Sequence, residues 1–410
     1  MRISSSAIYE AGTRQLNTLQ AQFARTQQQL GANKRLLSAA DDPIASARAL
    51  EVTQSKSINT QFETNRQNAR SELSQLDVTL ASAGTLIQDV QEIVVAAGNG
   101  ALSASDRGTY ATELEGKLDD LLAVANTADG AGGYMFAGFK SGLVPYAKSA
   151  TGAAYNGDQG QVMLQVGSSR RVQINATGPA VFDDIATGNG TFVTGTASTN
   201  TGSGVVSPGV VTDASLITGH DYALKFAVTG SPAVTTYTIQ DLTAGTPVPP
   251  PPAAPAPIPF QSGTPISFDG VTFDVKGVPA DGDTFTVKPS TKQSLFTTVT
   301  NLIAALRAPV SSGAGQVAYT SALTDASSNL AAGLDKVLGV RSTVGTNLKE
   351  LDYLDSTGSD ADIQYESTLS NLQDLDMVEA ISRFSQQQTA LEAAQKSFKM
   401  VSGMSLFNFL

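Results

Sequence analysis

The chain has 410 residues, which predicts two or three domains, and a formal net charge of −11. This acidic balance argues against nucleic acid as a partner, because no basic face is available to neutralise phosphates. The sequence contains no cysteine, which excludes disulfides, thiolate nucleophiles and cysteine metal sites, and no apolar run of about 18 residues that would span a membrane. The N-terminus lacks the apolar segment of a cleaved signal peptide, so we expect the chain to stay in the cytoplasm or to leave by a route that reads no such signal.

Residues 1–41 predict a helix with one narrow apolar stripe. From about Ser6 to Leu30, apolar residues recur at alternating steps of three and four, the spacing of a helix that packs on one partner helix. Gly31 and Asn33 are plausible end points. We call this stripe the N-terminal seam; its residues are Leu16, Leu19, Phe23, Thr26, Leu30, Asn33 and Leu37.

Asp41, Asp42 and Pro43 predict the start of a second helix, and with it the first part of a helical domain over residues 42–140. Asp42 can cap the new helix, and proline already has the backbone angle that a first helical residue needs. The helix should run to about Ala97 and face more than one neighbour, since its apolar stripe is wide. Asp41 and Asp42 could form a carboxylate pair by their adjacency, but capping explains at least one of them without catalysis.

A third helix is predicted after Ser103, because Asp106 stands three residues later, as in a capping box. The glycine-rich segment 129–133 ends the helical pattern, and residues 134–139 predict a short strand or hairpin.

Residues 141–290 predict an inserted all-β domain. This segment holds 15 of the 17 prolines and no glutamate, and short alternating runs bounded by turn residues replace the helical pattern. Pro247–Pro259 predicts an exposed polyproline II loop between strands; a ligand for a signalling domain is the less favoured interpretation. Strands are expected at Val162–Val166, Val172–Ile174, Tyr222–Val228, Thr236–Ile239, Val271–Val275 and Thr284–Val287.

Residues 291–375 return to helix and complete the helical domain. One helix is expected over Leu295–Leu306, ended by Pro309, and a second from about Leu323 to Asp355, with Thr357 and Gly358 as a break. Residues 376–410 then repeat the seam spacing. This C-terminal seam consists of Met377, Ala380, Phe384, Gln387, Leu391, Ala394, Phe398 and Val401.

The matching seams at the two ends predict that these ends pair as a coiled coil, with the rest of the chain folded between them. The alternative is that each stripe packs separately on a globular core. The expected fold class is mainly α with an inserted all-β domain: a terminal α-helical coiled coil, a long-helix bundle as middle domain, and an outer β-sandwich or barrel-like domain.

No residue pattern supports catalysis, a cofactor or a metal. His220 is the single histidine and cannot by itself build a catalytic triad or a usual zinc site, so we expect a solvent-exposed turn residue. Asp281, Gly282 and Asp283 lack the further oxygen ligands of a calcium loop and predict a hairpin turn. We therefore expect that the protein is not an enzyme.

Three segments carry a family resemblance. The N-terminal pattern (Met1–Ser4, Tyr9, Gln27–Leu30, Lys34–Leu36 and Ala40–Pro43), the segment Asp129–Gly138 and the ending Glu379–Leu410 resemble the hook-associated protein 3 family, which forms the hook–filament junction of the bacterial flagellum. The resemblance covers about residues 1–140 and 295–410. It implies a terminal coiled coil, a helical middle domain and an outward-facing variable domain.

The resemblance also implies partners and a location. They are other copies of this chain in a ring-like homo-oligomer, hook-associated protein 1, flagellin, an export chaperone and the flagellar type III export apparatus, with the protein ending in the extracellular flagellum. A flagellin-type filament subunit and a secreted adhesin or binding protein are the alternatives. The expected assembly interface consists of Leu16, Leu19, Phe23, Leu30, Phe384, Leu391, Phe398, Val401, Phe407, Phe409 and Leu410, beside the domain-junction turn of Asp41, Asp42 and Pro43.

Two further expectations concern assembly. The β domain should be dispensable, because its composition indicates a core of its own. Both seams should be mobile in the free monomer and become ordered in the assembled junction, because polar residues at seam positions weaken an isolated pair.

Overall fold

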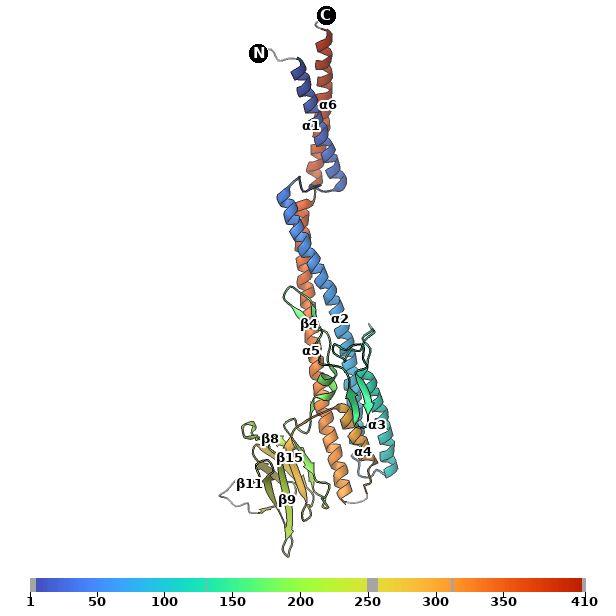
Figure 1. The fold of residues 1–410 in the computed structure, drawn as a ribbon, viewed down its shortest axis with the longest axis vertical. Coiled ribbons are helices and arrows are strands. Elements are labelled where there is room, and N and C mark those ends of the chain that lie inside the picture. Colours follow the sequence, from blue (N-terminus) through green and yellow to red (C-terminus); the bar gives the residue numbers. More distant parts are fainter. Residues whose placement is uncertain (1–4, 131, 249–256, 311–312, 408–410) are drawn as a thin grey trace. The chain divides into compact units, whose positions relative to one another are not determined.

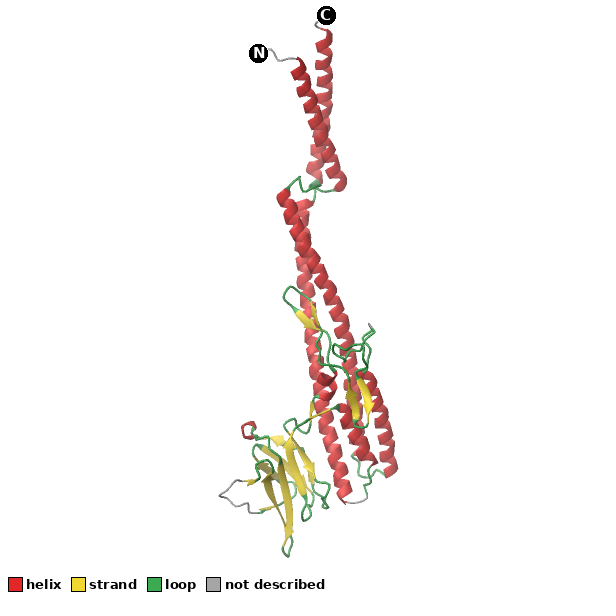
Figure 2. Ribbon diagram, viewed as in Figure 1, coloured by secondary structure: helices red, strands yellow, loops and turns green. Residues whose placement is uncertain are grey.

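The computed structural model describes residues 5–130, 132–248, 257–310 and 313–407. Long helices come first and last along the chain, and a β-rich region stands between them in sequence (Figures 1 and 2). The helices are α1 (Ser5–Ala32), α2 (Pro43–Ala97), α3 (Ala104–Ala125), α4 (Leu295–Arg307), α5 (Gly313–Gln373) and α6 (Met377–Phe407).

The chain forms two compact units. The terminal unit comprises Met1–Arg66, Val166–Ser168 and Asp352–Leu410, and the middle unit comprises Gln67–Gln165 and Ser169–Leu351. In the part of the chain that the structure describes, no helix is both long enough and apolar enough to cross a bilayer.

The predicted capping box before α3 is present. The Ser103 hydroxyl accepts a hydrogen bond from the backbone N–H of Asp106 at 3.2 Å, and the Asp106 carboxylate accepts one from the Ser103 N–H at 3.0 Å. These bonds satisfy N–H groups that a helix start otherwise leaves unpaired. The preceding helix, α2, ends at Ala97, as the following Gly98 predicts.

The predicted break at Thr357 and Gly358 is wrong, because α5 continues through both residues to Gln373. Gly358 has a packing role instead. A Cβ atom on this residue would lie 2.5 Å from Nη2 of Arg66, and its carbonyl oxygen accepts a hydrogen bond from Nδ2 of Asn59 at 2.8 Å. Glycine thus allows α2 to approach α5 closely here, which a sequence pattern cannot distinguish from a helix end.

The strands of the middle unit are antiparallel and form two larger sheets and three two-stranded ribbons. One larger sheet has the order β11-β10-β9-β15-β6 with β12 also paired to β10; the other has the order β13-β14-β7 with β8 also paired to β14. The strands are β1 (Tyr146–Ser149), β2 (Gly152–Tyr155), β3 (Met163–Gln165), β4 (Arg171–Gln173), β5 (Ile185–Ala186), β6 (Phe192–Thr196), β7 (Val205–Val206), β8 (Val210–Val211), β9 (Tyr222–Thr229), β10 (Val234–Asp241), β11 (Thr246–Val248), β12 (Ile258–Pro259), β13 (Pro265–Phe268), β14 (Val271–Lys276), β15 (Thr284–Pro289) and β16 (Lys292–Gln293).

Each of the six predicted strand segments overlaps an observed strand. The sequence did not predict the other strands, most of which have too few residues for an alternating pattern to appear. Both larger sheets contribute to one buried apolar cluster, so this β region has its own core. The cluster consists of Phe192, Val206, Tyr222, Leu224, Phe226, Tyr237, Ile239, Ile266, Val271, Phe273, Val275, Phe285 and Val287.

The segments 146–155 and 179–183 pack elsewhere, on α3 and α4 of the middle unit. The ring of Tyr146 lies 4.9 Å from that of Phe296 on α4, and its hydroxyl donates to Asp183 at 2.6 Å. Phe182 is buried and also contacts Phe296. The β region with a separate core therefore begins after Ala186, although composition changes already at about residue 141.

The segment 134–139 and the proline-rich loop differ from the sequence-based expectation in how far the structure tests them. Residues 134–139 form turns with one isolated bridge between Ala128 and Tyr134, not a strand or hairpin, because Met135, Phe136 and Ala137 are consecutive buried residues without strand alternation. The expected polyproline loop lies mostly outside the described residues; its ends, Val248 and Ile258, belong to strands that pair with β10.

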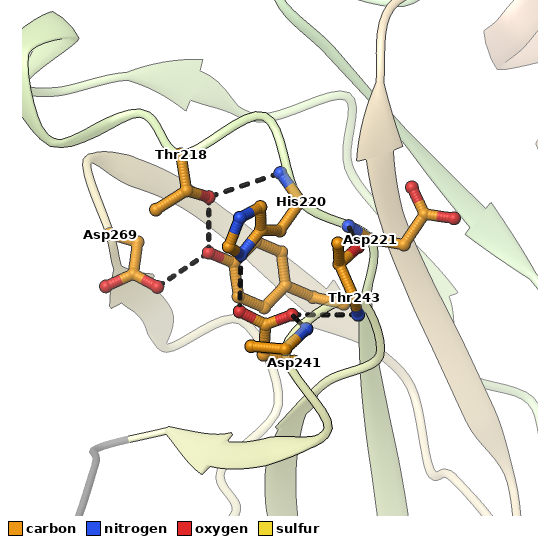
Figure 3. A network of polar contacts seen from close by, with 8 residues as sticks. Thr218, His220, Asp221, Asp241, Thr243 and Asp269 are labelled. Carbon is orange, nitrogen blue, oxygen red and sulfur yellow. Dashed lines mark hydrogen bonds and ion pairs between the residues drawn. The ribbon is translucent and has the colours of Figure 1, made fainter.

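His220 is less exposed than the solvent-exposed turn residue that the sequence predicts. It lies in the loop before β9, and Nδ1 of its half-buried ring is 2.6 Å from Oδ2 of Asp241 at the end of β10 (Figure 3). The same loop places Thr218 beside the hydroxyl of Tyr222, which donates to Asp269 at 2.7 Å. This hydrogen-bond network joins loops at one end of the sheet, so its role is structural.

Asp281–Asp283 forms a turn but not the predicted hairpin, because the flanking strands β14 and β15 belong to different sheets. The carboxylate of Asp283 accepts backbone hydrogen bonds from Thr201, Gly202 and Ala280 at 2.8–3.1 Å. These bonds use the oxygen atoms that a cation would need. Among the described residues, no group of three or more histidine, cysteine, aspartate or glutamate side chains is placed to hold a metal ion.

Candidate assembly surface

The two terminal helices, α1 and α6, lie side by side and run antiparallel in the terminal unit (Figure 1). Tyr9 meets Phe398 with ring centroids 5.1 Å apart, and Phe23 stacks on Phe384 at 4.6 Å with an interplanar angle of 26°. Such ring pairs add to the stability gained from apolar burial. They also fix the register of the two helices.

Burial along α6 follows the predicted seam spacing from Ala380 to Phe398. Ala380 is fully buried, and every other seam residue in this range is only partly buried. On α1, Thr26 is buried and the apolar seam residues are partly buried. The partly buried set is Leu16, Leu19, Phe23, Leu30, Phe384, Gln387, Leu391, Ala394 and Phe398. One partner helix therefore leaves much apolar surface in water.

A glycine sets the closest approach of the pair. A Cβ atom on Gly12 would lie 2.8 Å from Cδ2 of Phe398. Any larger residue would have to displace this ring. The sequence pattern did not identify Gly12, because glycine has no apolar side chain that would make it part of the stripe.

The polar seam residues differ in how they are satisfied. The hydroxyl of Thr26 donates to the carbonyl oxygen of Gln22 within its own helix at 3.1 Å. The Oε1 atom of Gln387 is buried and has no hydrogen-bond partner in the structure. A buried polar atom without a partner costs about 1–3 kcal/mol. Gln387 thus weakens the isolated helix pair, as expected of a polar residue at such a position.

Three predicted seam positions lie outside the packed stripe. Asn33 has a φ of 54° and follows the end of α1, so it terminates the helix. Leu37 comes after that end and is 39% exposed, and Met377, the first residue of α6, is 41% exposed. The three-and-four spacing predicts buried positions only where both helices are present.

The C-terminal part of the predicted interface is described only in part. Val401 and Phe407 lie in α6, and nothing is described of their side chains. Phe409 and Leu410 lie outside the described residues.

Asp41 and Asp42 organise the turn that joins α1 to α2. One carboxylate oxygen of Asp41 accepts backbone hydrogen bonds from Leu37 at 2.9 Å and Ser38 at 3.0 Å, and the other pairs with Arg25 at 2.6 Å. The N–H groups of Ser38 and Leu37 lower the pKa of Asp41. This carboxylate holds the turn and the end of α1 together.

Asp42 is the predicted cap of α2. Its carboxylate accepts a hydrogen bond from the N–H of Ala45 at 3.0 Å, two residues after Pro43 begins the helix, and this bond lowers the pKa of Asp42. Arg35 lies 3.5 Å from the other carboxylate oxygen. Both acidic residues are thus accounted for by backbone and arginine contacts, without catalysis.

A second turn, between α5 and α6, meets the first. The Arg35 backbone N–H donates to Gln373 at 2.7 Å, and its guanidinium donates to the Leu372 carbonyl at 2.7 Å. Asp376 caps α6 by accepting from the N–H groups of Val378 and Glu379. Sequence reasoning missed Arg35 in this role, because its partners are more than 300 residues away.

Two family models match the chain. Residues 3–141 match the bacterial flagellin N-terminal helical region, and residues 196–289 match the D2-like domain of flagellar hook-associated protein 1. The second match lies within the β region that has its own core.

Relatives match over nearly the whole chain. Flagellar hook-associated protein 3 of Salmonella typhimurium is 30% identical over 408 residues, which cover 99% of both chains. A crystal structure of hook-associated protein 3 from Legionella pneumophila is 33% identical with a TM-score of 0.74, covering 78% of this chain and 98% of that one. A structure of the flagellar junction protein from the same organism is 32% identical with a TM-score of 0.72, covering 80% of this chain and 100% of that one. The chain therefore belongs to the flagellar hook-associated protein 3 family.

Proposed function

We propose that this chain is a structural subunit of the bacterial flagellum and forms the junction between hook and filament. The observation that carries this proposal is the match to hook-associated protein 3 relatives over 99% of both chains. The solved relatives, one of which bears the name of a junction protein, share the fold. The role is mechanical, since the relatives are structural flagellar proteins.

The terminal helix pair provides the assembly surface. Its apolar seam residues remain partly exposed when α1 and α6 are paired, so each copy has apolar surface left for its neighbours. Complete burial of a large apolar side chain stabilises by about 1.5–3 kcal/mol, so covering several half-buried ones supplies substantial association energy. The interface comprises the apolar seam residues of both helices, with Val401, Phe407, Phe409 and Leu410 at the C-terminal end. The turn at Asp41–Pro43 sets the direction in which α2 leaves the pair.

Copies of the chain form a ring-like homo-oligomer between hook-associated protein 1 and the flagellin filament. Two matches support these neighbours: the N-terminal part resembles the flagellin helical region, and the β region resembles a domain of hook-associated protein 1. An export chaperone covers the apolar termini before the type III apparatus exports the chain. The absence of cysteine suits passage in an unfolded state to the cell exterior.

The architecture that we assign has three parts. Residues 1–41 and 376–410 form a two-stranded terminal coiled coil, and residues 42–140 and 291–375 form the middle helical bundle. The outer domain is a β-sandwich over residues 187–290. This domain is shorter than the expected insert of 141–290, because residues 146–155 and 179–183 pack on α3 and α4.

A pair of matched substitutions in a strain that lacks this protein tests the role. Phe23→Asp places a charge in the seam, whereas Ala24→Asp places the same charge on the exposed neighbouring position of α1. We expect Phe23→Asp to be secreted but to leave hooks without filaments and flagellin in the medium. Ala24→Asp should restore filaments, as seen by electron microscopy. Normal filaments with Phe23→Asp would contradict the proposed interface.

Copy number separates the junction role from the alternatives. A filament subunit would dominate the protein of sheared flagella, whereas a junction subunit should be a trace component. An adhesin would be dispensable for filament growth, so full motility of a strain without this protein would refute the junction role.

Hydrogen exchange on the purified monomer tests whether the terminal pair is ordered before assembly. We expect fast exchange before about Leu37 and after about Met377, with protection in the middle unit, because half-buried seams and the unpartnered Gln387 make a weak pair. Strong protection of both terminal helices in a verified monomer would show that the pair is stable by itself.

A further inference from the structure

A polar pocket lies in the middle unit, where the chain enters and leaves the β region. Its volume is about 280 Å³, close to the lower end of the range for small-molecule sites in proteins. One wall comes from the connections of the β region, just before β6 and at β16, and the others come from α4 and α5. We call it the root pocket; its polar lining includes Gln293, Thr298, Asn301, Asp325 and Asn329.

Asp325, on α5, is the one charged side chain among the described residues of this lining. It is partly buried and forms no hydrogen bond or ion pair with any residue that the structure describes. Burial without a partner raises the pKa of Asp325 to about 6. A carboxylate that is withdrawn from water and lacks a partner destabilises the fold, so a positively charged occupant of the pocket would offset that destabilisation.

A second acceptor lies in the same lining. The hydroxyl of Thr298 donates to the carbonyl oxygen of Ser294 at 3.1 Å, so it accepts the hydrogen bond from Nε2 of Gln293 at 2.8 Å. This bond fixes the orientation of the Gln293 amide. Its Oε1 atom is left with no donor among the described residues. The root pocket therefore combines a carboxylate with an amide oxygen that can accept an N–H group, and no basic side chain among its described lining residues competes for either.

The size and composition of the pocket favour an organic cation over a metal ion. Calcium is held by about six to eight oxygen atoms at about 2.3–2.6 Å. A single carboxylate beside a volume of about 280 Å³ does not supply such a shell. A guanidinium or ammonium group is larger and carries several N–H donors, and it pairs with one carboxylate while donating to neutral oxygen atoms as well.

We propose that the root pocket binds a guanidinium or ammonium group, held by the carboxylate of Asp325 and the side-chain oxygen of Gln293. The group belongs to a small molecule or to a basic side chain of a neighbouring protein. Its binding links the connections of the β region to α4 and α5, so it stabilises the middle unit. This site goes beyond the proposed function and does not depend on it.

Binding of methylguanidinium to the purified full-length chain tests the site. N-methylurea, which has nearly the same shape without the charge, is the control ligand. Saturation transfer from the protein to the ligand methyl protons reports binding for every variant. We expect saturable binding of methylguanidinium at pH 7 and none of N-methylurea. Asp325→Asn should lose the binding, whereas Asp335→Asn, which removes an exposed carboxylate from the same helix, should keep it.

The pH dependence identifies the group that holds the cation. No other titratable side chain lines the pocket among the described residues of α4, α5 and the β-region connections. Only ionised Asp325 should bind, so the affinity should rise about tenfold from pH 5 to pH 7 and level off above that. Saturating methylguanidinium should in turn lower the pKa of Asp325 toward the ordinary aspartate range, as followed by the carbon resonance of its carboxyl group.

Ala322→Leu separates a pocket from a simple surface charge. It fills part of the root pocket and leaves Asp325 in place, so it should weaken binding about tenfold. Four results would each overturn the inference: no binding by the parent, equal binding of N-methylurea, unchanged binding by Asp325→Asn or Ala322→Leu, or an affinity that is constant from pH 5 to pH 7. Displacement of methylguanidinium by a lower concentration of calcium would overturn it as well, because it would indicate a metal site.

Photocrosslinking identifies the source of the cationic group. Isolated flagella that contain Thr291→Cys, at the exposed edge of the pocket, are labelled with a photoreactive maleimide, since the chain has no native cysteine. A crosslink to another protein that is lost with Asp325→Asn assigns the group to a neighbouring side chain. No crosslink, together with methylguanidinium binding by the purified chain, assigns it to a small molecule. The titrations need only the purified chain, so failure of the proposed function leaves them valid.

Discussion

Replacing Gly358 by alanine should destabilise the protein, although the same change stabilises most helix interiors. Alanine is favoured over glycine inside a helix by about 1 kcal/mol, because glycine loses more backbone entropy on folding. At this position, however, the new Cβ would lie 2.5 Å from Nη2 of Arg66 and 3.3 Å from Oδ1 of Asn59. The guanidinium of Arg66 would have to move.

The magnitude depends on how firmly Arg66 is held. Its side chain is 4% exposed, forms an ion pair with Asp355 and donates from Nη1 to the carbonyl oxygen of Val166 at 3.2 Å. Leaving a buried charge without its partner costs about 3–5 kcal/mol. Asp355 is one-third exposed, so water screens the pair, and we expect about half of that cost. After the gain of about 1 kcal/mol in helix propensity, the net loss for Gly358→Ala is about 0.5–1.5 kcal/mol.

Gly339→Ala is the matched control in the same helix. A Cβ at Gly339 meets nothing within 4 Å, so this variant should gain about 0.5–1 kcal/mol. Urea unfolding of the purified chains, followed by circular dichroism, gives the free energy of unfolding for each. Equal stabilisation by the two substitutions would refute the packing role of Gly358.

The remaining predictions concern the β region and two carboxyl groups. A short Gly-Ser linker in place of residues 187–290 should preserve filament formation in electron micrographs. A linker in place of 141–290 should instead reduce the number of filaments, since it removes Tyr146 from the helical core; equal filament numbers for the two variants would contradict this boundary. Burial raises the pKa of Asp325 to about 6, so the folded chain binds this proton more tightly than the unfolded chain and gains stability as the pH falls from 7 to about 4. Asp325→Asn should therefore raise the free energy of unfolding at pH 7.5 by up to about 3 kcal/mol and flatten that pH dependence in urea titrations; an unchanged profile would contradict it. Asp42→Ala should lower the thermal midpoint near neutral pH, with the difference vanishing as the pH falls through the lowered pKa of Asp42, because the protonated carboxyl no longer caps α2; a constant difference down to pH 2 would be inconsistent with this.

The helices show how far local patterns reach. The capping box at Ser103 and the proline at the start of α2 are local features, and both mark helix starts in the structure. The spacing from Ala380 to Phe398 correctly identified which side of α6 is covered, because side-chain direction in a helix follows from the residue number alone. The same rule failed at Asn33 and Leu37, which follow the end of α1.

The candidate surface was predictable only in its repetitive part. Phe23 and Phe384 belong to regular stripes, and a partner helix follows from that regularity. Arg35 and Gly12 do not belong to any pattern. Their roles come from the distant carbonyl of Leu372 and the ring of Phe398, and nothing near them in the sequence indicates those partners.

The sequence by itself determined the helical ends, the β-rich interior and the matching stripes, since each follows from periodicity, composition and turn residues over short distances. The tertiary structure alone decided that α5 passes unbroken through Gly358, that residues 146–155 and 179–183 pack on α3 and α4, and that His220 contacts Asp241. These outcomes depend on which side chain lies opposite a given residue across the fold. Local preference is worth about 1 kcal/mol for a glycine in a helix, and contacts with a buried group such as Arg66 outweigh it.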